Sequence, residues 1–469
     1  MSTKAARRAF HERAGRALAD PALQRIIAEG QDYVQTHLEP ARAQAWWPAA
    51  LEEIGRVRSE TLAHLDDYVA QFASNVEAAG GHVFFAGDAG EARRHVTELA
   101  VQRGVKTVVK TKSMVTEEIA LNGALEARGV EVWETDLGEL IIQMAGEKPF
   151  HILGPAIHKS LEDVCELFSR SAGRQLPADP QALVRYARET LRERFLTAEM
   201  GITGANFGVA ATGSVVLVTN EGNGRMVTTM PRAHVVVMGV ERLVPTFPDL
   251  EAILKVLPQA GACMRATAYV TAVTGPRKTG ERDGPEELHV VLVDNGRSRI
   301  LGGRYAEILK CIRCGACVDV CPAYRKIGGH TYDSVYSGPI GAVLSPLLFG
   351  LERYAELPYA CSMCGACSEV CSARIPLADQ LRSLREDVVA EKLGARSTGV
   401  GFAAFAAVAK RRRIWSALEQ AALPLVAWAA ARGEWSSIPG PLGAWTRSKA
   451  LPRPEARSFR AQWRNKDRR

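Results

Sequence analysis

Residues 311–322 read Cys311-Ile312-Arg313-Cys314-Gly315-Ala316-Cys317-Val318-Asp319-Val320-Cys321-Pro322, and residues 361–371 read Cys361-Ser362-Met363-Cys364-Gly365-Ala366-Cys367-Ser368-Glu369-Val370-Cys371. Eight of the ten cysteines lie in these stretches, and both follow the pattern C-x2-C-x2-C-x3-C. Three thiolates on one tight turn suit three irons of one [4Fe–4S] cubane, and the fourth cysteine reaches the other cluster. The spacing therefore predicts two [4Fe–4S] clusters with crossed ligand sets: Cys311, Cys314, Cys317 and Cys371 for the first, and Cys361, Cys364, Cys367 and Cys321 for the second.

Other uses of cysteine fit this pattern less well. A structural zinc site usually takes two separated C-x2-4-C pairs. A disulfide framework belongs to small domains in oxidising compartments, and this chain has 469 residues and opens without an apolar leader. We therefore interpret the stretches as the halves of a ferredoxin-type domain, separated by the 39 residues from Pro322 to Ala360.

Composition and charge narrow the class of protein. Hydrophobic residues make up 47% of the chain and charged residues 24%, as in ordinary soluble globular proteins. The longest apolar runs, around Phe402–Ala409 and Ala421–Ala431, are too short to span a bilayer. Because thiolate ligands are sensitive to oxygen and no export signal is seen, we expect a cytoplasmic protein.

The end of the chain is strongly basic. Residues 391–469 contain 16 Lys and Arg against 5 Asp and Glu, a net charge of +11, which leaves −4 on the other 390 residues of a chain whose total is +7. Such a tail can meet an acidic partner or the inner face of an anionic membrane, or simply form a solvated helix face. No nucleic-acid-binding motif accompanies it, so we expect no nucleic acid partner and favour peripheral contact with the membrane or with a partner protein.

Periodicity divides the chain into four predicted regions. Residues 1–75 form a helical lead-in packed on the next domain, and residues 76–298 alternate strands with helices, which is typical of a mostly parallel sheet covered by helices. Residues 299–390 form the mainly helical two-cluster domain, and residues 391–469 form the basic C-terminal region, whose last thirty residues should be extended. The denser strands after Met200 leave open a mixed sheet or a second lobe.

The predicted strands and helices of the second region set the positions of the polar motifs. The strands are Val83–Ala86, Lys106–Lys110, Val130–Glu134, His151–Leu153, Ser214–Thr219, His234–Met238, Tyr269–Val273 and Leu288–Val293. The helices are Asp88–Arg103, Val115–Arg128, Leu137–Ala145, Ser160–Ser171, Pro180–Met200 and Pro248–Val256.

Polar motifs follow several of these strands. Lys110-Thr111-Lys112-Ser113-Met114 ends a strand and opens a helix, where an open α/β sheet binds anions, although a solvated strand end fits equally well. Glu134-Thr135-Asp136-Leu137-Gly138-Glu139 offers carboxylates for acid/base chemistry or for a metal, with Asp136 better explained as a helix cap. His151 and His158 flank the next strand end and are each more readily explained as core histidines.

A third motif is rich in glycine and amides. It comprises Gly204-Ala205-Asn206-Phe207, Ala211-Thr212-Gly213-Ser214 and Asn220-Glu221-Gly222-Asn223-Gly224-Arg225. These residues can aim backbone N–H groups at a ligand, or can form hairpin turns around a strand. Cys165 and Cys263 lie in apolar helical surroundings and are expected to be small buried residues. The chain has neither G-x-G-x-x-G nor a P-loop, which argues against NAD or FAD bound in the Rossmann manner.

Taken together, these motifs resemble those of the lactate utilization protein B family, which joins a LUD-type domain to a two-cluster ferredoxin domain. The resemblance rests on the Lys110–Met114, Glu134–Glu139, Gly204–Phe207, Thr212–Ser214 and Asn220–Asn223 motifs, Pro155-Ala156-Ile157-His158-Lys159, Cys311–Pro322, Tyr324–His330, Tyr336–Gly341 and Ser458–Trp463. One departure is that Ser372 follows Cys371 where the family pattern has proline, which leaves an N–H free to bond to sulfur and puts the potential of that cluster in doubt.

The resemblance implies a fold for residues 76–298 like that of the sugar-phosphate isomerase and coenzyme A transferase group. It also implies an electron-transfer component of an L-lactate dehydrogenase complex, an oxidoreductase that converts L-lactate to pyruvate. The implied partners are a cysteine-rich iron–sulfur subunit and a second LUD-type protein, with a quinone as a possible electron acceptor.

Substrate binding by this chain is a separate hypothesis. If lactate binds here, Lys110 and Lys112 would hold its carboxylate, and Glu139 or His158 would accept a proton. Two alternatives stay open at this point: an electron-transfer subunit for another 2-hydroxy acid such as glycolate, and a ligand-binding protein whose clusters sense redox state.

Overall fold

The computed structural model describes residues 2–429, 434–435, 446, 450–452 and 455–466. The chain divides into two units, residues 1–393 and 394–469, which are described separately.

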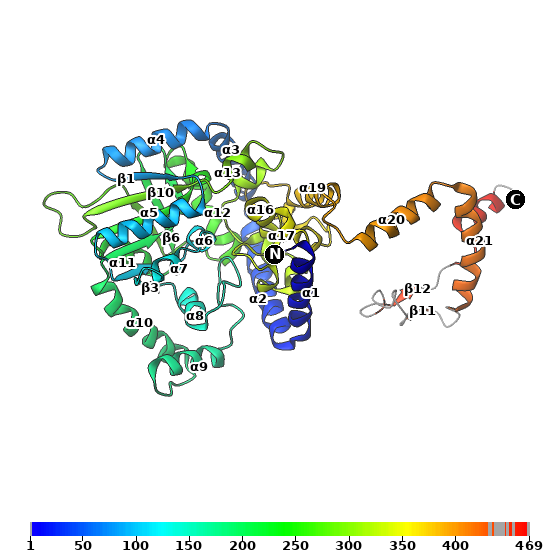
Figure 1. Ribbon diagram of the computed structural model, residues 1–469, viewed down its shortest axis with the longest axis horizontal. Helices are drawn as coiled ribbons and strands as arrows, with labels where there is room; N and C mark the ends of the chain where they lie inside the picture. Colours follow the sequence, from blue (N-terminus) through cyan, green and yellow to red (C-terminus); the bar gives the residue numbers. More distant parts are fainter. Residues whose placement is uncertain (1, 430–433, 436–445, 447–449, 453–454, 467–469) are drawn as a thin grey trace. The chain divides into compact units, whose positions relative to one another are not determined.

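A six-stranded parallel sheet forms the centre of the first unit, with strand order β1-β10-β7-β4-β2-β3 (Figure 1). Every pairing in it is parallel, which confirms the predicted architecture. The strands are β1 His82–Ala86, β2 Thr107–Lys110, β3 Glu131–Glu134, β4 Met200–Thr203, β7 Ala233–Gly239 and β10 Glu287–Val293. Strand β7 is buried along its whole length, so it reads as an almost continuous apolar run.

Different helices cover the two faces of this sheet. Successive side chains of a strand point to opposite faces, and in β2 Val108 packs with α5 and α7 whereas Val109 packs with α8, α9 and α10. The helices are α5 Ala89–Gln102, α6 Met114–Glu118, α7 Leu121–Glu126, α8 Leu137–Ala145, α9 Leu161–Ala172, α10 Pro180–Thr197 and α11 Asn223–Thr229.

A second sheet decides between the mixed sheet and the second lobe that the strand pattern had left open: the additional strands form a separate sheet. It has four strands in the order β8-β5-β6-β9, namely Leu243–Val244, Phe207–Val209, Ser214–Thr219 and Tyr269–Val273. Strands β5 and β6 form an antiparallel hairpin. Gly213 closes its turn with φ of +66°, and a Cβ there would lie 2.5 Å from the Val76 nitrogen, so the turn admits only glycine.

Four helices precede the sheets: α1 Thr3–Ala19, α2 Pro21–Arg42, α3 Trp47–Ala63 and α4 Leu65–Ala78. Helix α4 packs on β1, but α1 and α2 (dark blue) contact the cysteine-rich segment (yellow) (Figure 1). The Gln31 side-chain amide donates to the Val318 carbonyl oxygen at 2.9 Å, inside the first cysteine motif. The lead-in therefore contacts the cysteine-rich segment as well as the domain that follows it.

The α/β region also contains η1 Val240–Arg242, η2 Pro248–Leu250 and α12 Glu251–Ala262. The rest of the first unit is mainly helical, as predicted. Its elements are α13 Arg297–Leu301, η3 Ala306–Lys310, α14 Ala316–Asp319, α15 Pro322–Ile327, η4 His330–Tyr332, α16 Gly338–Phe349, α17 Leu351–Tyr354, η5 Leu357–Tyr359, α18 Ala366–Glu369 and α19 Leu377–Ala390.

The second unit contains α20 Arg396–Ala409, α21 Arg412–Ala429, α22 Phe459–Lys466 and the short pair β11 Glu434–Trp435 and β12 Leu451–Pro452. Part of the stretch predicted to be extended lies outside the described residues, and helix α22 corrects the prediction for the part inside. Within the described ranges, no helix combines the length and the apolar character needed to cross a membrane.

The structure corrects three of the predicted strands and helices. Residues 151–153 form bends instead of a strand, because Nδ1 of His151 accepts hydrogen bonds from the N–H groups of Leu153 and Gly154. The helix predicted from Val115 breaks at Ala120, which has φ of +51°. The helix predicted for Pro180–Met200 ends at Thr197, and Met200 belongs to strand β4. All four residues of this strand are buried, so its sequence lacks the alternation of apolar and polar residues that would mark a strand.

A buried charge network joins the α/β region to the cysteine-rich segment. The Arg297 guanidinium donates two hydrogen bonds to Glu118, at 2.9 and 2.8 Å, and a third to Glu241 at 2.6 Å. The side chains of all three residues are at most 2% exposed. The Tyr336 hydroxyl donates to the same Glu118 carboxylate from the segment between the cysteine motifs.

We predict that Arg297→Ala destabilises the protein by about 3–5 kcal/mol, because it leaves two buried carboxylates without their cation. The measurement is the shift of the urea unfolding midpoint followed by far-UV circular dichroism. Arg277→Ala removes a partly exposed ion pair with Glu286 and should cost less than about 1 kcal/mol. Equal costs for the two variants would contradict this assignment.

Candidate functional site

The eight motif cysteines line two separate cavities. Cys311, Cys314, Cys317 and Cys371 line one, which we call the first cysteine cavity. Cys321, Cys361, Cys364 and Cys367 line the other, the second cysteine cavity. Each cavity thus receives three cysteines from one motif and the fourth from the other, the grouping that the spacing predicted for cluster ligands. All ten cysteines of the chain are free.

The two motifs have the same backbone geometry. Gly315 and Gly365 both have φ of +84°, and Arg313 and Met363 have φ of +62° and +59°. These left-handed residues curl each loop so that backbone N–H groups face sulfur: the Met363 N–H donates to Cys361 Sγ at 3.3 Å, and the Arg313 N–H donates to Cys311 Sγ at 3.4 Å. N–H groups aimed at thiolate sulfurs suit a ligated iron–sulfur cluster.

The cysteines repel one another as thiolates. Burial, followed by the neighbouring cysteines, raises the pKa of Cys371 to about 12 and that of Cys367 to about 11. Four sulfurs that resist ionisation together require a positively charged centre to hold them as thiolates. The donor set therefore fits a metal cluster.

The first cysteine cavity lies beside several buried arginines. Arg242 Nη1 donates to the Cys311 carbonyl oxygen at 2.7 Å, and its guanidinium lies over the Phe207 ring at 4.4 Å. Arg58, fully buried on α3, donates to the carbonyl oxygens of Leu243 and Leu309 at 2.5 and 3.0 Å. Sequence reasoning missed both, because an isolated arginine in a helix or turn gives no signal that it will be buried.

Ser372 contacts the first cysteine cavity through its side chain. Its hydroxyl oxygen lies 3.5 Å from Cys314 Sγ, and the residue is fully buried. The expectation was a hydrogen bond from the backbone N–H of this residue. The structure instead brings the hydroxyl to sulfur.

A polar cavity lies next to the first cysteine cavity, and the Ile152 side chain lines both. Its lining residues are Lys112, Met114, Glu117, Glu139, Pro149, His151, Ile152 and Val335. Burial raises the pKa of Glu139 to about 8 and lowers the pKa of Lys112. A carboxyl group and an amine whose pKa values are pushed toward neutrality are suited to acid/base chemistry.

Lys110 does not line the polar cavity. Its side chain is buried, its Nζ forms an ion pair with Glu134 at 2.8 Å, and it donates a hydrogen bond to Thr116 at 2.9 Å. Glu134 and Glu117 hold the pKa of Lys110 above its ordinary value despite burial. Lys110 therefore supports the strand end beneath the cavity.

The Glu134–Glu139 motif and the glycine- and amide-rich motif come together at the edge of the sheet. Asp136 caps α8 by accepting a hydrogen bond from the Glu139 N–H at 3.2 Å, which confirms the capping interpretation. Burial and the Asp136 carboxylate raise the pKa of Glu221 to about 7. Gly204 approaches Ser113 so closely that a Cβ would lie 2.7 Å from the serine Oγ.

The two candidate histidines have different surroundings. His151 is buried, and its Nε2 lies 3.3 Å from the Asp319 carboxylate of the first cysteine motif. His158 lies outside the lining of the polar cavity, and its Nε2 is 2.7 Å from the Glu147 carboxylate. Burial lowers the pKa of His158 to about 4.

Known families cover the chain in two segments. The LUD domain matches residues 69–293, and the 4Fe-4S dicluster domain matches residues 307–375. The second match contains all eight motif cysteines.

Similar proteins extend this match to nearly the whole chain. Lactate utilization protein B of Geobacillus thermodenitrificans (strain NG80-2) is 48% identical over 429 residues, which covers 90% of this chain and 88% of that protein. Lactate utilization protein B of Bacillus velezensis (strain DSM 23117) is 43% identical over 477 residues, which covers 100% of this chain and 99% of that protein. The crystal structure of a DUF162 family protein from Deinococcus radiodurans is 14% identical, covers 50% of this chain and 98% of that chain, and gives a TM-score of 0.26, too low to bear on the fold. On the strength of the two relatives, the chain belongs to the lactate utilization protein B family.

Proposed function

We propose that this chain holds two [4Fe–4S] clusters and acts as the electron-transfer subunit of a multi-protein complex that oxidises L-lactate to pyruvate. The observation that carries the proposal is the grouping of the eight cysteines around two cavities, each completed by the other motif. When bound, a [4Fe–4S] cluster accepts and releases one electron at a time. The names of the relatives, lactate utilization protein B, supply the substrate.

The burial of the cysteines suggests the direction of electron flow. The first cysteine cavity adjoins the polar cavity of the α/β region through Ile152. The second is nearer the surface, since Cys364 and the neighbouring Met363 are exposed. We infer that electrons enter at the first cavity and leave toward a partner at the second.

The polar cavity is the proposed place for the 2-hydroxy acid. Its volume of about 10 Å³ holds one water molecule, so its lining must move apart to admit lactate. Lys112 Nζ donates one hydrogen bond to the Leu153 carbonyl oxygen at 2.7 Å, and its other N–H groups would hold the carboxylate. Glu139 would accept the proton that leaves the hydroxyl group.

Oxidation of lactate to pyruvate removes the hydroxyl proton and transfers the C2 hydrogen as a hydride. We infer that a two-electron organic cofactor held by a partner subunit accepts this hydride, releases its proton to water and passes the two electrons on singly, so one-electron acceptors must receive them. Two clusters in one chain meet that need.

The proposal includes partners and a location. A cysteine-rich iron–sulfur subunit and a second LUD-type protein would complete the complex, and a quinone would take the electrons. The protein would work in the cytoplasm, with its basic C-terminal region against a partner or the inner face of the membrane. Residues 391–469 carry the net charge of +11 that supports such a contact.

We predict that the clusters become reduced by L-lactate only when the partners are present. The measurement is electron paramagnetic resonance after L-lactate is added to the anaerobically purified complex and, separately, to this chain alone. Reduction by glycolate instead of lactate would transfer the proposal to another 2-hydroxy acid. No reduction by either acid in the complex, with normal growth of a deletion strain on lactate, would favour the redox-sensing alternative.

The crossed grouping predicts which pairs of cysteines act together. Cys311→Ala with Cys371→Ala should remove one cluster and leave about four irons and four sulfides per chain, because both line one cavity. Cys311→Ala with Cys321→Ala should damage both sites. The unmodified chain and Cys165→Ala should each retain about eight irons. If the Cys311/Cys321 variant kept about four irons and the Cys311/Cys371 variant lost both clusters, each motif would hold its own cluster.

Glu139→Gln should lower the rate of lactate-driven reduction by about 10²–10⁴-fold, because glutamine cannot accept a proton. In the unmodified complex the rate should rise with pH up to about 8, where the Glu139 carboxyl group loses its proton, and then level off. The variant should lack this rise. Glu131→Gln, at an exposed residue of β3, is the matched control. An unchanged rate and pH profile in Glu139→Gln would reject the role of this residue and leave electron transfer untouched.

A further inference from the structure

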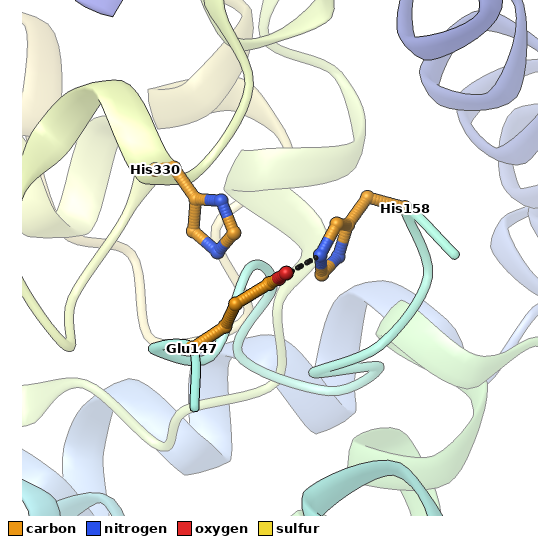
Figure 2. Close-up of side chains that lie close together, drawn as sticks. All are labelled: Glu147, His158 and His330. Carbon is orange, nitrogen blue, oxygen red and sulfur yellow. Dashed lines mark hydrogen bonds and ion pairs between the residues drawn. The ribbon is translucent and has the colours of Figure 1, made fainter. Parts of the chain in front are cut away.

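Three metal-binding side chains meet at a place that the proposed function does not use. Glu147 follows helix α8, His158 precedes helix α9, and His330 begins η4 in the segment between the cysteine motifs. One ligand-capable atom from each lies within 4.8 Å of the other two. Figure 2 shows the three side chains directed toward one another.

We propose that Glu147, His158 and His330 form a binding site for a divalent transition metal ion, separate from the cysteine cavities. Two imidazole nitrogens and one carboxylate oxygen form a ligand set used by zinc and by non-haem iron, with positions left open for water or a ligand. Metal–ligand bonds of about 2.0–2.2 Å place tetrahedral ligand atoms about 3.3–3.6 Å apart. The more widely spaced atoms must therefore approach one another, and the Glu147 and His158 atoms, now 2.7 Å apart, must separate slightly.

The ligands are held in place by their neighbours. The Phe150 ring stacks on His158 with a centroid distance of 4.6 Å, and it meets His330 edge-on at 5.0 Å. The Lys148 carbonyl oxygen lies 2.8 Å from His330 Nε2. Such contacts from outside the ligand shell fix the orientation of metal-binding residues.

His158 provides a second sign of an incomplete site. Its side chain is only 9% exposed, and its Nδ1 has no hydrogen-bond partner within the described part of the chain. Among the described residues, this buried ring makes one polar contact, between Nε2 and Glu147 at 2.7 Å. A buried imidazole with so little compensation is costly unless it serves a further interaction.

A cavity beside the three residues gives access from outside. It is lined by Glu147, Lys148, Pro149, His330, Asp333 and Ser334. Lys148 is paired with Asp333 at 2.8 Å, and Lys159 with Glu147, so the formal charges of these four residues cancel. The added charge of a divalent ion would therefore favour an anion, such as hydroxide or a carboxylate, at the open position.

The site would link two parts of the first unit. Glu147 and His158 come from the α/β region, whereas His330 comes from the segment that separates the cysteine motifs. A bound ion would tie that segment to the α/β region close to Phe150, whose carbonyl oxygen accepts a hydrogen bond from Tyr324 at 3.0 Å.

The test is equilibrium dialysis of the full chain with radioactive Zn²⁺ under anaerobic conditions. The protein must hold its iron and sulfide, assayed before and after dialysis, because empty cysteine sites also bind zinc. We expect about one zinc per chain, and an affinity lowered by about 100-fold or more in the His158→Ala/His330→Ala double variant. His37→Ala, which removes an exposed histidine of α2, should bind zinc like the unmodified chain.

Two further measurements keep the result interpretable. Lys159→Gln removes the cation that competes for Glu147 and should tighten zinc binding, an effect that simple damage to the fold would not produce. Circular dichroism and the iron content of the double variant should match those of the unmodified chain. The proposal is overturned if the loaded chain takes up no zinc at micromolar concentrations, or if the double variant takes up as much as the unmodified chain. Neither result depends on lactate oxidation.

Discussion

The buried ion pairs of Arg297 are the interaction on which the rest of the first unit depends. Ions removed from water are stable only when paired and hydrogen-bonded, and Arg297 satisfies Glu118 and Glu241 together. These residues belong to three different elements, and Tyr336 adds a contact from the loop before α16. The α/β region and the cysteine-rich segment can therefore separate only by exposing or orphaning these charges, which explains why they form one compact unit.

The same network gives the two cysteine cavities different electrostatic surroundings. Three arginines, Arg58, Arg242 and Arg313, lie near Cys311 with one glutamate, Glu241, so the balance there is positive. A positive environment stabilises an anionic thiolate centre and its reduced form. Cys364 of the second cavity is exposed, and water takes over that role. The two sites are thus alike in backbone geometry and unlike in environment.

Sequence patterns predicted what depends on spacing and on alternation. The cysteine grouping follows from a local motif, and the parallel sheet follows from strands that alternate with helices, so both were accessible. The residues that surround the cysteine motifs could not be predicted from the sequence. Gln31 reaches Val318 from a helix nearly 300 residues earlier in the chain, and nothing near Gln31 marks it as different from a solvated residue. His330 likewise approaches Glu147 only because the segment between the cysteine motifs folds back on the α/β region. Contacts of this kind depend on tertiary packing and leave no periodic trace.

The exchange of the fourth cysteine between the motifs has a consequence for how the protein is made. Cys371 lines the cavity of the earlier motif, and Cys321 lines the cavity of the later one. On a growing chain, neither group of four is complete until the ribosome has passed residue 371. A truncated product that contains the whole first motif would still lack a finished site. With the proposed clusters, insertion of iron and sulfide would therefore come late in biosynthesis, and filled sites would report that the chain was translated through both motifs.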